Sequence, residues 1–219
     1  SGNIRSLIDT LLKTDSRIEV LVVDDDSPDG TWKIVRQMSR SNPRIHLLHR
    51  TGDRGRGSAG IAGFREAIRL DADAVIEMDA DWSHDPQWIP PMIECLEKGA
   101  DVVIGSRLVP GGSEIGRHWL RGIITYCANL YIRLVLGLKV LDATSGFRLF
   151  SGDCIRALPW EGMCATGPET VQEILYAAHR LGFRIQEVPI TFIERRHGVS
   201  TFNTRIMLRS MAAIWRLRL

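Results

Sequence analysis

Two carboxylates one residue apart, Asp79 and Asp81, directly follow an apolar run over residues 74–78. Ligands of open α/β sheets bind outside the carboxyl ends of the strands, which is where these side chains are expected. Carboxylate oxygens at such a place can hold Mg²⁺ or Mn²⁺, which would bridge to phosphates and offset the charge on a departing diphosphate. The alternative is a structural role, in which Asp79 caps a helix that begins near Pro86 and Asp81 is solvated.

A second acidic cluster, Asp24-Asp25-Asp26, follows the apolar run over residues 18–23 and is therefore expected at the same edge of the sheet. Three adjacent carboxylates repel one another unless a cation, an amide or a base N–H compensates, which favours a ligand-binding role. The alternative is that Ser27 or Asp26 caps a helix that starts at Pro28.

Arginines and glycines alternate in the run Arg50-Thr51-Gly52-Asp53-Arg54-Gly55-Arg56-Gly57, just before a predicted helix. Glycines let backbone N–H groups approach an anion, and the helix N-terminus and the arginines attract phosphate. The spacing does not match GxxxxGK[ST], so a P-loop NTPase is disfavoured. Two further arginines, Arg107 and Arg121, flank a later loop that contains Gly111-Gly112.

The end of the chain is strongly basic, because residues 195–219 contain six arginines and no acid. Apolar residues interleave with these arginines, which predicts a basic amphipathic helix that can lie on an anionic membrane surface. The alternative is a helix that packs on its own domain with a solvated basic face.

The elements that position these residues alternate along the chain, which is typical of an α/β sheet with helices on both faces. We therefore expect an α/β fold with a mixed, mostly parallel sheet. The spacing predicts helices over residues 4–12, 31–39, 61–68, 86–98, 119–138 and 168–181, and strands over 18–23, 45–49, 74–78, 101–105 and 184–192. Sheets of this type usually begin with a strand, so we expect the first strand to be missing from the chain.

Length and composition limit the remaining possibilities. The 219 residues suffice for one sizeable core, and no run of about 18 apolar residues suggests a membrane span. We expect a cytoplasmic protein with no nucleic-acid partner, although the net charge of +2 by itself says little about partners.

Taken in order, these motifs resemble the family 2 glycosyltransferases, and within them the polyprenyl-phosphate (dolichyl-phosphate) mannose synthases. The resemblance covers nearly the whole chain. It is carried by residues 23–31, Arg56-Gly57-Ser58-Ala59, residues 79–86, Gly105-Ser106-Arg107, Arg121, Ala128-Asn129, residues 142–148, Glu187-Val188-Pro189-Ile190 and Glu194-Arg195.

The resemblance implies a GT-A fold over residues 1–194, with residues 195–219 as a basic amphipathic helix of the same domain. It implies that Asp24 and Asp25 contact the nucleoside of the donor, while Asp79 and Asp81 flank the diphosphate and a Mg²⁺ or Mn²⁺ ion. The other predicted donor-site residues are Arg56, Gly57 and Ala80. The predicted catalytic residues are Asp81, Arg107, Arg121 and Arg195, the arginines holding phosphate groups.

The implied donor is GDP-mannose and the implied acceptor is a polyprenyl phosphate. A phosphate monoester is largely dianionic near neutral pH, since its second pKa is about 6, so its oxygen can attack the anomeric carbon directly and with inversion. A hydroxyl acceptor would instead need a carboxylate base, for which Asp142 and Glu173 are the candidates. The remaining alternatives are another nucleotide-sugar and a degenerate subunit that binds a nucleotide-sugar without catalysis.

The lipid acceptor also implies a place in the cell. We expect the chain to be peripheral on the cytoplasmic face of a membrane, and a separate membrane-anchoring subunit is compatible with the sequence.

Overall fold

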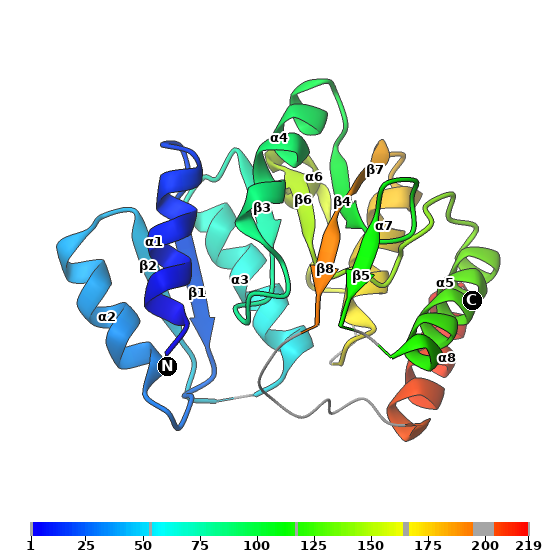
Figure 1. The fold of residues 1–219 in the computed structure, drawn as a ribbon, viewed down its shortest axis with the longest axis horizontal. Coiled ribbons are helices and arrows are strands. Elements are labelled where there is room, and N and C mark those ends of the chain that lie inside the picture. Colours follow the sequence, from blue (N-terminus) through cyan, green and yellow to red (C-terminus); the bar gives the residue numbers. More distant parts are fainter. Residues whose placement is uncertain (1, 53, 117, 164–166, 195–203, 219) are drawn as a thin grey trace.

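The computed structural model describes residues 2–52, 54–116, 118–163, 167–194 and 204–218, with the backbone alone for residues 204–209. Helices and strands alternate along most of the chain, and helices flank the strands on both sides (Figure 1). The helices are α1 (Ile4–Thr14), α2 (Thr31–Ser41), α3 (Arg56–Arg69), α4 (Ile89–Glu97), α5 (Trp119–Leu136), α6 (Gly152–Ala157), α7 (Thr170–Arg180) and α8 (Thr204–Arg218), with a single 3₁₀ turn, η1 (Pro86–Trp88). The predicted α/β class is confirmed.

The strands form three groups rather than one continuous sheet. They are β1 (Val20–Asp24), β2 (Ile45–His49), β3 (Ala74–Glu77), β4 (Val102–Ser106), β5 (Ser113–Ile115), β6 (Arg148–Ser151), β7 (Ile185–Pro189) and β8 (Thr191–Ile193). The pairs β1–β2, β4–β7 and β5–β8 are parallel, whereas β6 runs antiparallel to β3 and β4 in the order β3-β6-β4-β7. Within the described residues no strand joins β1 to β3, and the missing opening strand stays a prediction.

Several details differ from the sequence-based expectation: helix α3 begins at Arg56 rather than after Gly60, and strand β5 and helix α6 were not predicted. Strand β6 was not predicted, because it has four residues and begins with Arg148, a residue type that rarely marks a buried strand. The single strand expected over residues 184–192 is two strands, β7 and β8, which belong to different groups. The break follows Pro189, which has no backbone N–H to donate to a ladder.

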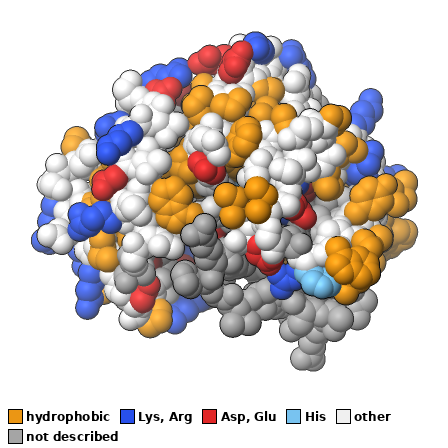
Figure 2. Space-filling model, in the orientation of Figure 1, with side chains coloured by type: hydrophobic (Ala, Val, Ile, Leu, Met, Phe, Trp, Pro, Cys, Tyr) orange, Lys and Arg blue, Asp and Glu red, His pale blue; other side chains and the backbone are white. Residues whose placement is uncertain are grey.

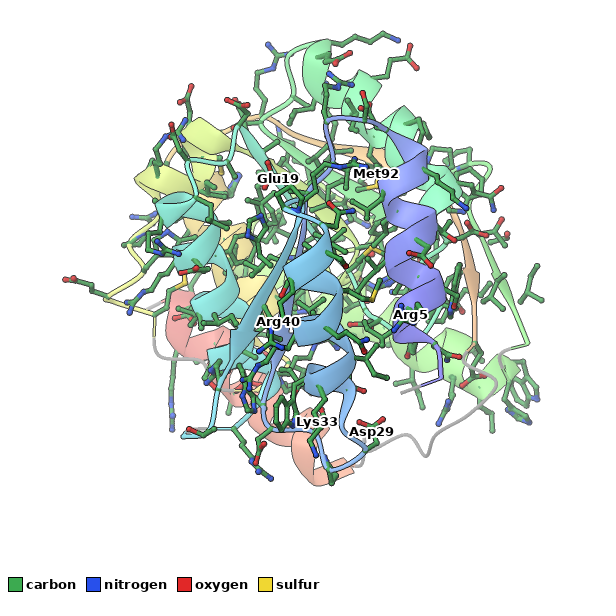
Figure 3. The ribbon with its side chains drawn as sticks, turned by 90° about the vertical axis from the view of Figure 1, so that its left-hand side faces the viewer. Arg5, Glu19, Asp29, Lys33, Arg40 and Met92 are labelled. Atoms are coloured by element: carbon green, nitrogen blue, oxygen red, sulfur yellow. The ribbon has the colours of Figure 1, made fainter. Side chains whose placement is uncertain are left out.

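The core that supports the first two groups is shared. The apolar face of α1 (Ile4, Leu7, Ile8 and Leu11) packs in one cluster with residues of α2, α4 and the strands. Figure 3 shows α1 and α2 side by side, with the fully buried Met92 of α4 close to α1. This packing holds the β1–β2 pair to the larger sheet. The ends of β1 and β3 therefore lie on the same surface of the molecule.

Helices α5 and α8 pack against each other on the far side from α2 (Figure 1). The Tyr131 hydroxyl donates to the carbonyl of Met211, and Arg218 donates to the carbonyl of Val135. None of the described helices, including the 18-residue α5, is both long enough and apolar enough to cross a membrane.

Candidate functional site

The Asp24-Asp25-Asp26 run lies at the end of β1, and each carboxylate has a different partner. Asp24 is buried and accepts from the backbone N–H of Ser27. Asp25 accepts from the backbone N–H of Gly55 at 2.9 Å and forms a 2.9 Å ion pair with Arg50. Asp26 adopts a left-handed φ of 58° and contacts Arg54 at 3.3 Å. The repulsion within the run is therefore offset by an arginine-rich loop.

Neither Asp26 nor Ser27 caps a helix, so the capping alternative for this run is wrong. Helix α2 begins at Thr31, and Asp29 accepts hydrogen bonds from the backbone N–H and the hydroxyl of Thr31. The Asp24 and Asp25 carboxylates are thus engaged with loops that border the end of β1, next to the beginning of α3.

The second acidic pair follows β3. Asp79 accepts a hydrogen bond from the Arg56 guanidinium at 2.9 Å, and both side chains are partly exposed, 38% for Asp79 and 50% for Arg56. Arg56 and Gly57 form the first turn of α3, so a helix N-terminus faces the same place. Asp85, not Asp79, caps the turn η1, which removes the structural alternative for Asp79.

Asp81 and its neighbours are held by local hydrogen bonds. One Asp81 oxygen accepts from the backbone N–H of Ser83 at 3.0 Å and from its hydroxyl at 2.5 Å. Ser83 thereby orients the Asp81 carboxylate. Ala80, between the two acids, is exposed.

His84 supports the pair from behind. Its ring is buried, stacks on Phe147 with centroids 5.0 Å apart, and accepts at Nδ1 from the backbone N–H of Asp79. Burial lowers the pKa of His84 to about 4, so the ring is neutral at pH 7. A neutral ring that accepts at Nδ1 carries its proton on Nε2. His84 therefore fixes the backbone of Asp79 without adding a positive charge near it.

The donor set of this pair fits a divalent ion that completes its shell elsewhere. Within the described part of the chain, no three His, Cys, Asp or Glu side chains are grouped to hold a metal ion. Mg²⁺, however, is commonly held by one or two carboxylates together with waters and substrate phosphates. Two oxygen ligands beside an arginine and a helix N-terminus match that mode.

Arg107 is in a different environment. Its guanidinium binds both oxygens of Asp142 at 2.7 Å, donates to Thr144 at 2.8 Å and pairs with Glu114 at 3.3 Å. The Arg107 side chain is 8% exposed and that of Asp142 is fully buried. Burial alone would raise the pKa of Asp142, but the hydrogen bonds and charge of Arg107 outweigh this and lower it.

The same cluster reaches α5 and β7. Asn129 is buried in α5 and binds Thr144 through both ends of its amide, since it donates to the hydroxyl and accepts from the backbone N–H. Glu187 of β7 accepts from the backbone N–H groups of Leu141 and Asp142. Because both Asp142 oxygens accept hydrogen bonds from Arg107, neither is available as a base. This removes Asp142 as a candidate base for activating a hydroxyl acceptor.

Arg121 lies near the surface at the start of α5. It forms an ion pair with Glu194, whose backbone N–H bonds to the end of β5. Its 44% exposed side chain could exchange this carboxylate for a phosphate. Arg195, the other arginine predicted beside it, lies outside the described residues.

Sequence reasoning did not single out Glu77, although one signal was available. Glu77 is a carboxylate within an otherwise apolar run, two residues before Asp79. In the structure one of its oxygens, Oε2, is buried and accepts no hydrogen bond from the described residues.

Comparison with known proteins identifies relatives of the whole arrangement. The model of Glycosyl transferase family 2 matches residues 1–158. The chain is 40% identical to the undecaprenyl-phosphate mannosyltransferase of Micrococcus luteus over 198 residues, which cover 90% of this chain and 81% of that protein. It is 36% identical to the polyprenol monophosphomannose synthase of Mycolicibacterium smegmatis over 205 residues, 92% of this chain and 77% of that protein.

Among solved structures, the fold is similar to that of glucosyl-3-phosphoglycerate synthase from Mycobacterium tuberculosis. Its complex with phosphoglyceric acid superposes with a TM-score of 0.67 at 20% identity, covering all of this chain and 74% of that one. A complex of the same enzyme with Mn²⁺, uridine diphosphate and phosphoglyceric acid gives a TM-score of 0.63 at 22% identity, covering 98% of this chain and 70% of that one. These similarities confirm the expected GT-A fold.

Proposed function

Because the chain belongs to glycosyl transferase family 2 and is a glycosyltransferase, we propose that it transfers mannose from GDP-mannose to a polyprenyl phosphate. The product would be polyprenyl-phosphate mannose with inverted configuration at the anomeric carbon. Two relatives, matched over 198 and 205 residues, carry this acceptor class in their names, which supports the proposal. The observation that carries it is the meeting of Asp79, Asp81 and Arg56 at one edge of the sheet.

The donor half of the site is built to accept a diphosphate. Asp79 and Asp81 would hold Mg²⁺ or Mn²⁺, which when bound neutralises charge on the leaving group. Arg56 and the N-terminus of α3 provide further positive potential at the same place. Asp24 and Asp25, at the end of β1, would contact the nucleoside, and their loop partners hold them in position.

The acceptor half needs no base. As an acceptor phosphate oxygen forms its bond to the anomeric carbon, the bond from that carbon to the diphosphate breaks and GDP leaves. The protein's contribution is to position the two substrates and to neutralise charge. Arg121 can bind the acceptor phosphate if Glu194 is displaced, and Arg195 is proposed to join it. Arg107, with every guanidinium nitrogen engaged, would act by holding the neighbouring backbone.

A lipid acceptor requires a surface that meets lipid, and α5 has one. Its inward face buries Thr125, Asn129, Ile132 and Leu136, while its outward face exposes further large apolar side chains. These are Trp119, Leu120, Ile123, Ile124, Tyr126, Leu130 and Leu134. An exposed apolar face of this extent is unfavourable in water and fits a membrane interface. In Figure 2 apolar side chains gather at the right-hand edge, where Figure 1 places α5.

Charge favours the membrane over a second copy of the chain. Neither α5 nor α8 contains an acidic residue, whereas both carry arginines, so two such faces would repel each other and an anionic bilayer would attract them. We therefore propose a peripheral position on the cytoplasmic face of a membrane, with or without a separate anchoring subunit.

Sugar transfer is tested with purified protein, radiolabelled GDP-mannose, polyprenyl phosphate and Mn²⁺ or Mg²⁺. We expect label to move into the organic phase, and Asp81→Ala to reduce this rate by about 10³-fold. Asp85→Ala, which removes a nearby carboxylate that only caps a turn, is the control and should retain activity. If wild-type protein transfers no sugar to the lipid, or if Asp81→Ala is as active as wild type, the proposal fails.

Membrane contact is tested separately by co-sedimentation with vesicles of neutral or anionic lipid. Trp119→Ser with Leu134→Ser should weaken binding to anionic vesicles about tenfold, because both side chains lie on the exposed face of α5. Leu181→Ser removes a 53% exposed apolar side chain outside α5 and should not weaken vesicle binding. Two results would rule out this face as the membrane contact. One is unchanged vesicle binding by the double variant, and the other is a wild-type dimer that becomes a monomer in the double variant.

A further inference from the structure

We propose that Glu77 and Arg148 form a buried couple that positions Asp79, and with it the metal-binding pair, through the loop of residues 143–147. This inference rests on the proposed function, because it concerns how the donor site is held. Neither residue touches the predicted substrates, so both are positioning residues.

Arg148 is the central part of this couple. It is fully buried, and its three nitrogens donate to the backbone carbonyls of Ser145 at 2.7 Å, Ala143 at 2.8 Å and Val171. Two of these carbonyls belong to the loop that follows Asp142, and the third lies in α7. A planar guanidinium holds three separated acceptors from three nitrogens in a fixed geometry, whereas a lysine ammonium presents its three donors from a single nitrogen. Arg148 thus ties the loop to β6 and to α7.

Glu77 supplies the opposite charge. It is the register partner of Arg148 across the β3–β6 ladder, which puts the two side chains on the same face of the sheet. The hydrogen bonds of the buried Arg148 guanidinium go to carbonyls, which leave its charge uncompensated, and the carboxylate at the facing position of β3 offsets that charge. Because Glu77 is on β3, the couple connects the loop to the strand that leads into Asp79.

Two contacts carry the loop's position to Asp79. A Cβ atom built on Gly146 would lie 2.6 Å from Nη2 of Arg56, the same nitrogen that binds Asp79, so the loop borders this guanidinium closely. Next in the loop, Phe147 stacks on His84, whose Nδ1 accepts from the backbone N–H of Asp79. A shift of the loop would therefore move both the side-chain partner and the backbone partner of Asp79.

The test uses Glu77→Gln, which keeps the size of the side chain and removes its charge. Two readouts are measured: Mn²⁺ binding in the presence of GDP, by electron paramagnetic resonance, and the kinetic constants for transfer. We expect Mn²⁺ affinity and kcat each to fall about tenfold, with KM for the polyprenyl phosphate unchanged. Ile76→Ala is the matched control, since this neighbour faces the opposite side of β3 and contributes only to packing.

The comparison at equal thermal stability decides the outcome. If Glu77→Gln and Ile76→Ala lose the same thermal stability and bind Mn²⁺ with the same affinity, the couple is merely structural and the inference is overturned. If Glu77→Gln does not fold, Arg148→Lys, which keeps the charge and loses the fork, must show the same loss of Mn²⁺ affinity for the inference to hold. Wild-type protein that binds Mn²⁺ but transfers no mannose would overturn the proposed function alone, and wild-type protein that binds no Mn²⁺ would overturn both.

Discussion

Two of the regions with arginine–carboxylate contacts, the donor edge and the cluster around Arg107, differ in burial and in number of partners. At the donor edge, Arg56 and Asp79 share one 2.9 Å contact and are 50% and 38% exposed. In the cluster around Arg107, the guanidinium binds both Asp142 oxygens and is 8% exposed, while Asp142 has no exposure. The same two residue types thus build one open contact and one closed network.

The difference separates residues that can meet a ligand from residues that hold the site together. An exposed pair in high dielectric is weak, so a diphosphate or a metal ion can replace either partner at little cost. A buried pair is costly to break, because removal of one partner leaves an uncompensated charge in a low-dielectric environment. We therefore expect substitutions at the donor edge to act on turnover and substitutions in the Arg107 cluster to act on stability.

The largest expected effect is in the buried cluster. Asp142→Asn should lower the free energy of unfolding by about 3 kcal/mol or more, because Arg107 then keeps only Glu114 as a charged partner. Urea unfolding followed by circular dichroism measures this. Asp153→Asn, which removes a 90% exposed carboxylate, is the control and should change stability by less than about 1 kcal/mol. Equal stability of the two variants would contradict the distinction between the regions.

At the donor edge, Arg56→Ala should reduce kcat by about 10- to 100-fold while the free energy of unfolding changes by less than about 1 kcal/mol. The reason is that Arg56 has one partly exposed contact with Asp79 and lies at the N-terminus of α3, where a diphosphate is expected. Transfer kinetics and urea unfolding are measured on the same preparation. Arg40→Ala, which removes an arginine from α2 away from the site (Figure 3), should leave both quantities unchanged.

Acid pH offers a way to sharpen the contrast at Asp142. The hydrogen bonds and charge of Arg107 hold the folded-state pKa of Asp142 below the ordinary aspartate value of 3.8, against the effect of burial. A depressed pKa contributes stability that is present above the unfolded value and is lost as pH falls through the folded value. Between pH 5 and pH 3, the free energy of unfolding of the wild-type protein should therefore fall more steeply than that of Asp142→Asn. Parallel curves would mean that Asp142 is not the group that titrates.

Much of the fold follows from local patterns in the sequence. Runs such as Val20-Leu21-Val22-Val23 combine apolar and β-branched residues, which predicts buried strands whose ends bear the acids. The contact of Asp79 with Arg56 could be anticipated. Asp79 follows the end of a strand and Arg56 lies at the beginning of a helix, and both positions belong to one edge of the sheet. The GT-A fold and the glycosyltransferase family were also predicted correctly.

What the sequence did not predict depends on contacts between distant segments. Arg107 and Arg56 are the same residue type in similar glycine-containing surroundings, yet Asp142, which is 35 positions away, encloses one of them. Strand β6 is too short to show an alternation of apolar and polar residues. Its first residue, Arg148, is charged and yet buried, because it donates to backbone carbonyls rather than to solvent. Likewise, the outward apolar face of α5 has the same spacing as an ordinary buried face, and only the packing shows which side is inside.

The smallest expected effect tests the exposed side of the comparison at its limit. Arg54 and Asp26 form a 3.3 Å contact in which the side chains are 62% and 41% exposed, so Arg54→Ala should change the free energy of unfolding by about 0–1 kcal/mol. The difference should shrink further when salt is raised from about 0.05 M to about 1 M, because the screening length falls from more than 10 Å to about 3 Å. Raised salt should not remove the effect of Asp142→Asn, whose charges are shielded from solvent ions. A salt response of the same size in both variants would show that burial does not separate the two regions, since only a solvent-exposed pair is open to screening.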